Sequence, residues 1–87
     1  MSSTVCNVLF FASLRDDVGR DSVSLTLDAP TSLPGLLEQL ALQLPDAAMI
    51  ALQAENVRVA VNQSFLTGNE LVQPGDEVAF MPPVTGG

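Results

Sequence analysis

The sequence has no histidine, tryptophan or tyrosine, and Cys6 is its one cysteine. Zinc sites are built chiefly from histidine and cysteine, and nucleophilic serines and cysteines are commonly activated by a histidine. A single cysteine also excludes a disulfide within the chain. These absences argue against a resident metal, against a nucleophile–histidine pair and against a disulfide-stapled fold.

Basic residues are equally scarce. Arg15, Arg20 and Arg58 stand against ten acidic residues, the net charge is −7, and there is no lysine. No basic patch can displace counterions from nucleic-acid phosphates, and an anionic membrane surface would repel the chain. We therefore expect no binding to nucleic acid or to membranes. The acidic charge either favours docking on basic protein partners or only keeps a small apolar domain soluble.

Long apolar runs are missing as well. None approaches the ~20 residues that cross a bilayer, and residues 1–4 carry no basic charge of the kind that opens a secretory signal. We expect a soluble, cytoplasmic protein. The 87 residues suffice for one small domain, and 47% of them are apolar against 15% charged. A core this small cannot absorb so much apolar surface, so some is expected to remain for a partner.

Several segments alternate as β-strands do. Residues 22–27 alternate strictly between apolar and polar, which predicts a half-exposed strand paired as a hairpin with the first strand. Pro74-Gly75 favours a type II turn before the last strand. The predicted strands are residues 4–12, 22–27, 57–61, 65–66 and 78–81, the fourth being short and at an edge.

One apolar stripe has helical spacing. It predicts a helix over residues 33–44, with Ser32 as its N-cap, Pro34 in its first turn and Pro45 as its end. A helical turn closed by Gly19 and a weaker helical segment at 46–54 are also expected. The stripe consists of Leu33, Leu36, Leu37, Leu40, Ala41 and Leu44.

The order of elements is therefore strand, strand, helix, strand, short strand, strand. A helix laid across one face of a mixed sheet would bury the leucine stripe. We predict the ubiquitin-like β-grasp, an α+β fold with a mixed four- to five-stranded sheet and one main helix across one face. The domain is expected to span residues 1–82, followed by a flexible C-terminal Gly-Gly tail over residues 83–87.

No internal catalytic constellation is found. The Asp16-Asp17 doublet is typical of a solvated helical turn, and the carboxylates elsewhere form no acid–base pair. Cys6 lies within a predicted strand, where a cysteine is a small buried apolar residue rather than a nucleophile.

The C-terminus is the exception. Gly86 and Gly87 have no Cβ atoms, so this end of the chain can thread into a channel too narrow for side chains. A terminal carboxylate is unreactive by itself, but adenylation makes it a mixed anhydride that sulfur can attack. The resulting thiocarboxylate is a good nucleophile. A frayed, glycine-rich chain end is the alternative. The position of the two glycines directly after the last predicted strand and a proline pair favours Gly87 as the reactive residue, with Gly86 letting the tail pass.

The ending Phe80-Met81-Pro82-Pro83-Val84-Thr85-Gly86-Gly87 resembles that of the molybdopterin synthase small subunits (MoaD type). These belong to the ubiquitin-like sulfur-carrier family, together with the thiamine-pathway carrier ThiS. The apolar strand and leucine–arginine pair of residues 8–15, the helix opening, the turn at 61–63 and the hairpin at 75–80 also fit. Met81 departs from the family, which often has phenylalanine there, and Pro34-Gly35 is less typical in the first helical turn.

The resemblance implies a sulfur-carrier subunit of molybdopterin synthase. A ubiquitin-activating-type adenylyltransferase would use ATP to form a Gly87 acyl-adenylate, and a sulfur donor protein would convert it to the thiocarboxylate. The sulfur would then attack cyclic pyranopterin monophosphate in a pocket of the large synthase subunit, forming the dithiolene of molybdopterin. The chain itself would bind no cofactor, and a heterotetramer with the large subunit is expected.

A docking surface is predicted independently. If Val78 and Phe80 face the helix, the residues between and after them point to the opposite face of the sheet, and an exposed apolar patch there marks an interface. The sequence leaves the reverse assignment of the two faces open. The expected partner-binding residues are Leu9, Phe11, Ala79, Met81, Pro82, Pro83, Val84 and Thr85.

Other functions stay open at this point. The chain could carry sulfur for thiamine, cysteine or thio-tRNA synthesis, could modify proteins through isopeptide bonds from Gly87, or could be a binding module with an incidental glycine tail. The absence of lysine either protects an acyl-adenylate from attack by the chain's own amines or reflects a compositional preference for arginine.

Overall fold

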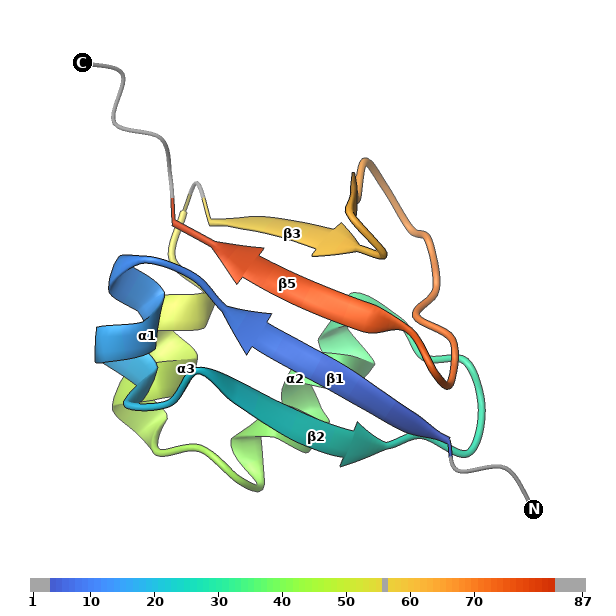
Figure 1. Cartoon of the computed structure of the whole chain (residues 1–87), viewed down its shortest axis with the longest axis horizontal. Helices are drawn as coiled ribbons and strands as arrows, with labels where there is room; N and C mark the ends of the chain where they lie inside the picture. Colours follow the sequence, from blue (N-terminus) through green and yellow to red (C-terminus); the bar gives the residue numbers. More distant parts are fainter. Residues whose placement is uncertain (1–3, 56, 83–87) are drawn as a thin grey trace.

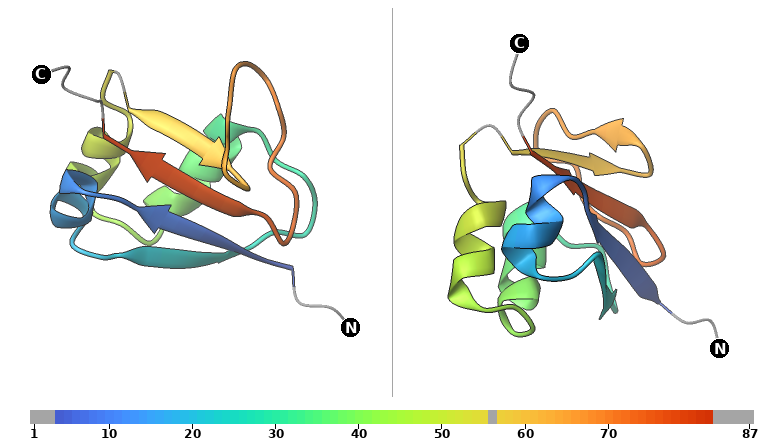
Figure 2. Two further views of the ribbon diagram at one scale, coloured as in Figure 1. Left: turned by 45° about the horizontal axis from the view of Figure 1, so that its top comes forward. Right: turned by 60° about the vertical axis from the view of Figure 1, so that its left-hand side comes forward.

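The computed structural model describes residues 4–55 and 57–82. Its strands form a five-stranded mixed sheet in the order β2-β1-β5-β3-β4. The helices lie on one side of this sheet, and no helix of the described chain covers the other side (Figures 1 and 2). The elements are β1 (Val5–Phe10), α1 (Ser13–Val18), β2 (Ser22–Thr26), α2 (Leu33–Ala41), α3 (Asp46–Leu52), β3 (Arg58–Val61), β4 (Ser64–Phe65) and β5 (Glu77–Met81).

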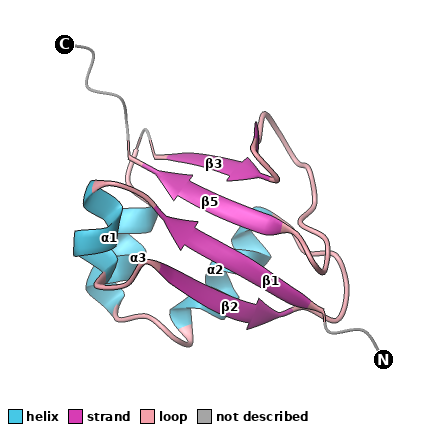
Figure 3. Cartoon of the chain, in the orientation of Figure 1, coloured by secondary structure: helices cyan, strands magenta, loops and turns pink. Residues whose placement is uncertain are grey.

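The first and the last strand of the domain, β1 and β5, pair with each other in the middle of the sheet. β1 pairs in parallel with β5, so that Val8 lies opposite Val78 and Phe10 opposite Phe80. The other flank of β1 pairs antiparallel with β2, which confirms the predicted hairpin partner. β3 pairs antiparallel with β5 and with the short edge strand β4. The α+β architecture with a mixed sheet agrees with the sequence prediction (Figure 3).

Helix α2 begins as its sequence predicts. The Ser32 hydroxyl accepts a hydrogen bond from the backbone N–H of Gly35 at 3.2 Å, and Pro34 occupies the first turn. A Cβ atom on Gly35 would collide with the hydroxyl of Thr31, so the glycine that follows Pro34 allows a close approach of the incoming chain. Leu36 and Leu40 are buried against the sheet.

The predicted end of this helix is wrong. The helix ends at Ala41, and residues 42–44 continue in a tightened turn in which the Gln43 N–H donates to the Leu40 carbonyl at 2.9 Å. The turn leaves Leu42 exposed to solvent but returns Leu44 to the core. Pro45 is then extended and opens α3. The apolar spacing correctly predicted the burial of Leu36, Leu40 and Leu44, but Ala41, which the predicted stripe included, is exposed. The helix ends before Pro45 is reached, and the chain then turns into α3.

The core lies between the sheet and the helices. Phe10 and Phe80, cross-strand neighbours in the central pair, are 1% exposed, and their ring centroids are 6.0 Å apart with planes tilted by 33°. That geometry is favourable for two aromatic rings. Because these residues and Val78 face the helices, the alternation along β5 places Ala79 and Met81 on the opposite face. The assignment of faces that the sequence left open is thereby resolved.

A polar cluster joins the two turns at one end of the sheet. Asn62 and Gln63 form the two-residue turn between β3 and β4, with φ angles of 51° and 72°. The Asn62 side chain donates to Asp76 Oδ1 at 2.9 Å and accepts from the Glu77 N–H at 3.0 Å. The predicted type II turn is also present, since Gly75 has φ 91° and the Asp76 N–H donates to the Gln73 carbonyl.

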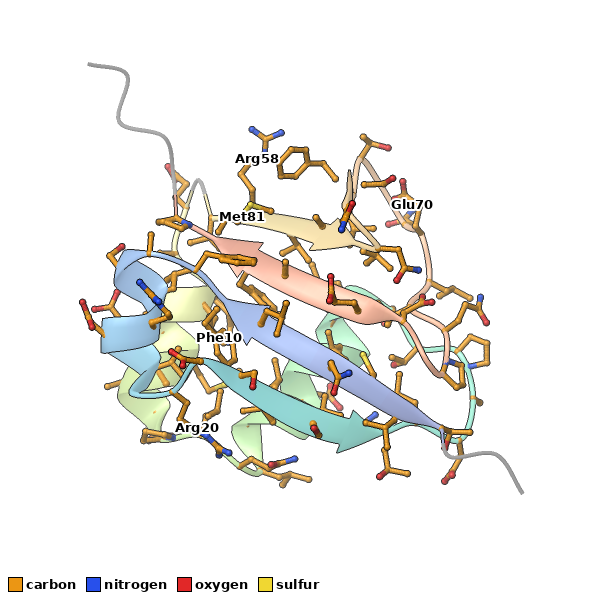
Figure 4. All side chains as sticks on the ribbon, viewed as in Figure 1. Phe10, Arg20, Arg58, Glu70 and Met81 are labelled. Carbon is orange, nitrogen blue, oxygen red and sulfur yellow. The ribbon has the colours of Figure 1, made fainter. Side chains whose placement is uncertain are left out.

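The loop before β5 is organised by Glu70, labelled in Figure 4. Its carboxylate accepts hydrogen bonds from the Gly68 N–H at 2.8 Å and from the Thr67 hydroxyl at 3.0 Å. Hydrogen bonds from its own backbone N–H and from those of Thr67 and Gly68, with a further one from the Thr67 hydroxyl, lower the pKa of Glu70 from 4.5 to about 2.

None of the helices described is long enough and apolar enough to cross a membrane.

The Asn62 cluster gives a first testable prediction. Replacing Asn62 by alanine removes both side-chain hydrogen bonds and puts alanine at a positive φ, and we expect a loss of about 1–2 kcal/mol in the free energy of unfolding. Gln63→Gly is the matched control, because glycine suits the second position of this turn and should leave stability equal or higher. Urea denaturation measures both, and an Asn62→Ala variant as stable as the wild type would contradict the role given to this side chain.

The lowered pKa of Glu70 predicts a dependence of stability on pH. Because the folded pKa of about 2 lies below the ordinary 4.5, the stabilisation is fully present above about pH 4.5 and is lost as the pH falls toward 2. Glu70→Gln should flatten the unfolding free energy over this window. The pKa can be read from the pH titration of the side-chain carboxyl carbon in nuclear magnetic resonance spectra, and a midpoint near 4.5 would refute the assignment.

Candidate functional site on the outer face of the sheet

The interior of the domain offers no reactive group. Cys6 is fully buried in the core, and its burial, with a smaller contribution from the Asp76 carboxylate, raises the pKa of the thiol from 9.0 to about 11. A thiol in this state is neither exposed nor ionised, as the sequence predicted. Among residues 4–55 and 57–82, no group of three or more histidine, cysteine or acidic side chains could hold a metal ion.

The arginines near α1 do not form an anion site. Arg15 and Arg20 border an open hollow of about 440 Å³ together with Gly19, but Asp16 and Asp21 line it as well. The mixed charge cancels any preference for an anion, and the acidic doublet at Asp16 belongs to an exposed helical turn, as predicted.

The sheet surface turned away from the helices, unlike the hollow at α1, carries a group of apolar residues. One row across it runs from Leu9 on β1 through Ala79 on β5 and Ala60 on β3 to Phe65 on β4. The next row toward the C-terminal end of β5 holds Met81, and Phe11 continues β1 at the same level through a hydrogen bond from its N–H to the Phe80 carbonyl. We call these six residues the outer patch: Leu9, Phe11, Ala60, Phe65, Ala79 and Met81.

The outer patch is apolar and partly open to solvent. Phe11 and Phe65 are 44% and 48% exposed, whereas Ala79 and Ala60 are 8% and 2% exposed between their larger neighbours. Small residues at the centre and large ones around them make a shallow surface rather than a pocket. Exposed apolar surface of this kind is typical of protein interfaces.

The outer patch occupies only one end of this face. Toward the start of β5 the next row consists of the exposed polar residues Ser24, Asn7 and Glu77. Apart from Val5, which is exposed at the start of β1, this face is apolar where β1 and β5 end and polar toward the start of β5. Because these two strands are parallel, β5 ends at the apolar end of the face, next to the end of β1 (Figure 1).

The backbone is unusual where the outer patch meets α1. Ala12 has φ 52° and ψ −130°, a combination that non-glycine residues rarely adopt. It turns the chain from β1 into α1 directly after Phe11 and leaves the phenyl ring outside the core. The Leu14 N–H, which donates to the Phe11 carbonyl at 3.1 Å, holds this corner closed.

One positively charged side chain, that of Arg58, lies at the edge of the outer patch. Arg58 lies opposite Met81 in the β3–β5 pairing, and its guanidinium carbon is 4.6 Å from the centroid of the Phe65 ring. Figure 4 places the Arg58 side chain at the same end of the sheet as Met81. Such stacking of a guanidinium on an aromatic face is a cation–π interaction.

The predicted partner-binding residues divide into two groups. The structure brings Leu9, Phe11, Ala79 and Met81 together on one face and places the half-buried Pro82 at its border. Pro83, Val84, Thr85, Gly86 and Gly87 lie outside the described residues.

The sequence prediction missed Ala60, Phe65 and Arg58. The signal that could have found them is the Asn62-Gln63 turn, which fixes Phe65 opposite Ala60 and so puts β4 on the same face.

Solved structures of similar shape define the class of fold. The small archaeal modifier protein SAMP1 from Haloferax volcanii matches with a TM-score of 0.73 and 22% identity, over 95% of this chain and 99% of that one. A chain of the complex of subunits 1 and 2 of the molybdopterin-converting factor from Helicobacter pylori matches with a TM-score of 0.58 and 19% identity, again over 95% and 99%. At these identities the likeness concerns the fold, which is the predicted ubiquitin-like β-grasp.

Sequence comparison defines the family. The model of the ThiS family matches residues 8–87. The molybdopterin synthase sulfur carrier subunit of Haemophilus influenzae is 43% identical over 81 residues, which cover 93% of this chain and 98% of the relative. The subunit of the same name from Escherichia coli is 42% identical over 80 residues, covering 92% and 96%. The chain belongs to the ThiS/MoaD family of ubiquitin-like proteins, as its C-terminal sequence predicted.

Proposed function

We propose that this chain is the sulfur carrier subunit of a molybdopterin synthase and that Gly87 carries the sulfur. The observation on which the proposal rests is the similarity, at 42–43% identity over nearly the whole chain, to two relatives named as such subunits. The geometry supports it, because the last described strand ends at the apolar end of the outer face. A partner that covers the outer patch is then beside the start of the tail.

The chemistry is divided between the chain and its partners. An activating enzyme of the ubiquitin-activating type would use ATP to join the Gly87 carboxylate to AMP, which makes the acyl carbon open to attack. Sulfur at the sulfide level, delivered by a sulfur donor protein, would then displace AMP from the acyl carbon and leave a thiocarboxylate. In the large subunit the sulfur would attack cyclic pyranopterin monophosphate. No described residue supplies a nucleophile or a metal for these steps, so the carrier contributes its terminal group and its docking surface.

The outer patch is the surface that we assign to the large subunit. It offers two half-exposed phenylalanines around a shallow centre, and aromatic anchors of this kind contribute strongly to the affinity of protein interfaces. The structure of the Helicobacter pylori complex shows that a chain with this fold assembles with a second subunit.

The role of Gly87 is tested by reconstitution with ATP, an activating enzyme and a sulfur source. We expect the intact mass to rise by about 16 Da, because sulfur replaces one oxygen of the carboxylate and yields an ionised sulfur nucleophile. With the large subunit and cyclic pyranopterin monophosphate, the wild-type carrier should yield molybdopterin and the Gly87 deletion should yield none.

Equal urea midpoints for the two proteins would exclude a folding defect as the cause. Molybdopterin formation without Gly87 would overturn the proposal. A mass gain with no transfer to the precursor would instead indicate a carrier for another pathway, and products of high molecular mass would indicate a protein modifier.

The outer patch gives a separate prediction. Phe11→Ser should weaken binding to the large subunit by about 10-fold or more, since a buried aromatic anchor contributes about 2 kcal/mol or more to an interface. Ile50→Ser is the matched control, because Ile50 is 72% exposed on α3, on the helical side of the sheet. It should leave binding unchanged. Calorimetric titration measures both, and equal losses for the two variants would show that the patch has no special role.

A further inference from the structure

Arg58 is the charged residue whose position the proposed function does not yet explain. It is exposed, lies on the outer face opposite Met81, and holds its guanidinium over the ring of Phe65. Both of these neighbours belong to the outer patch. Arg58 therefore lies at the edge of the outer patch, within the area that a partner covering both Met81 and Phe65 would bury.

The contact with the Phe65 ring determines which groups of the guanidinium can still bind a partner. The guanidinium carbon lies over the Phe65 ring, 4.6 Å from its centroid, and the N–H donors lie in the plane of the guanidinium group. Among residues 4–55 and 57–82, none of the side-chain hydrogen bonds has Arg58 as its donor. Because the ring restrains the long side chain, less conformational entropy remains to be lost when a partner accepts these donors.

A partner that covers Phe65 must also cover Arg58, because the guanidinium lies on the ring. Removing a charged group from water without a compensating acceptor is costly enough to prevent tight binding. A carboxylate satisfies the guanidinium best, since it matches the fork of N–H donors with two oxygens and compensates the charge.

Arg58 differs from the other two arginines in the charges that surround it. Arg15 and Arg20 share their hollow with Asp16 and Asp21. On β5 the acidic residue of the outer face is Glu77, four residues before Met81, which corresponds to about 13 Å along an extended strand. The outer face is thus positive at the end where the chain continues into its tail and negative at the opposite end.

We infer that Arg58 pairs with an aspartate or glutamate on the large subunit, at the edge of the apolar surface that covers the outer patch. This inference rests on the proposed function. The pair acts as an orienting contact. An apolar patch alone tolerates several rotations of the partner, whereas a cation at the tail end and an anion at the other end favour the one in which the tail points toward the pocket.

The test compares two charge reversals. Arg58→Glu and Arg20→Glu both replace one positive by one negative charge, so each changes the net charge by two units, from −7 to −9. The two side chains lie at opposite sides of the molecule (Figure 4). We expect Arg58→Glu to weaken binding to the large subunit about 10-fold or more at low salt, and Arg20→Glu to change it less than about 3-fold. The difference between them should shrink as salt rises.

Arg58→Lys refines the test. It keeps the charge but loses the planar fork and the stacked geometry, so we expect its affinity to fall between those of the wild type and Arg58→Glu. Urea denaturation of all variants separates weaker binding from weaker folding. Suppose that Arg58→Glu and Arg20→Glu bind the large subunit equally well, while the wild type gains the mass of one sulfur and binds the large subunit. That result overturns this inference and leaves the proposed function intact. A wild-type carrier that forms no thiocarboxylate overturns the proposed function instead.

Discussion

The parallel pairing of β1 with β5 places the first and the last strand of the domain side by side at the centre of the sheet. Every feature of the two faces depends on its register. With Phe10 opposite Phe80, the aromatic pair and the valines beside it fill the core under α2. The alternate residues of the same two strands, Leu9 with Phe11 and Ala79 with Met81, then belong to the outer patch. A slip of one residue in either strand would exchange the two faces of that strand and would bring Leu9 or Ala79 into the core. The core and the candidate docking surface are thus two consequences of one register.

An apolar outer face makes a domain prone to self-association when its helices cover only one side of the sheet. Two features limit this self-association. Ala60 and Ala79 occupy the centre, so the apolar area there is small, and the larger side chains lie around them. The net charge of −7 keeps copies of the chain apart, because like-charged molecules repel over the Debye length. The chain has three cationic side chains against ten acidic ones. The position of each arginine therefore matters more for recognition than it would on a surface with equal numbers of both charges.

Local chemistry predicted most of the fold because its signals are short-range. The Ser32 cap, the Pro74-Gly75 turn and the alternation of residues 22–27 are each decided within a few residues of the chain. The helix end at Ala41 was missed because residues 41–44 contain no glycine or proline to signal it, although the chain turns there toward α3. The same holds for the site: Leu9 and Met81 could be placed by alternation along their own strands, but Phe65 and Arg58 join them only through pairings across the sheet.

The position of Pro82 sets a limit on the geometry of any partner that uses Gly87. Residues 83–87 are five in number, and five residues reach at most about 18 Å even when fully extended. In the proposed function, the acyl carbon must therefore react within that distance of the border of the outer patch. An activating enzyme and a large subunit would both have to satisfy this limit. A large subunit that covers the outer patch would therefore have to open its reactive pocket beside the patch, at the end where β1 and β5 finish.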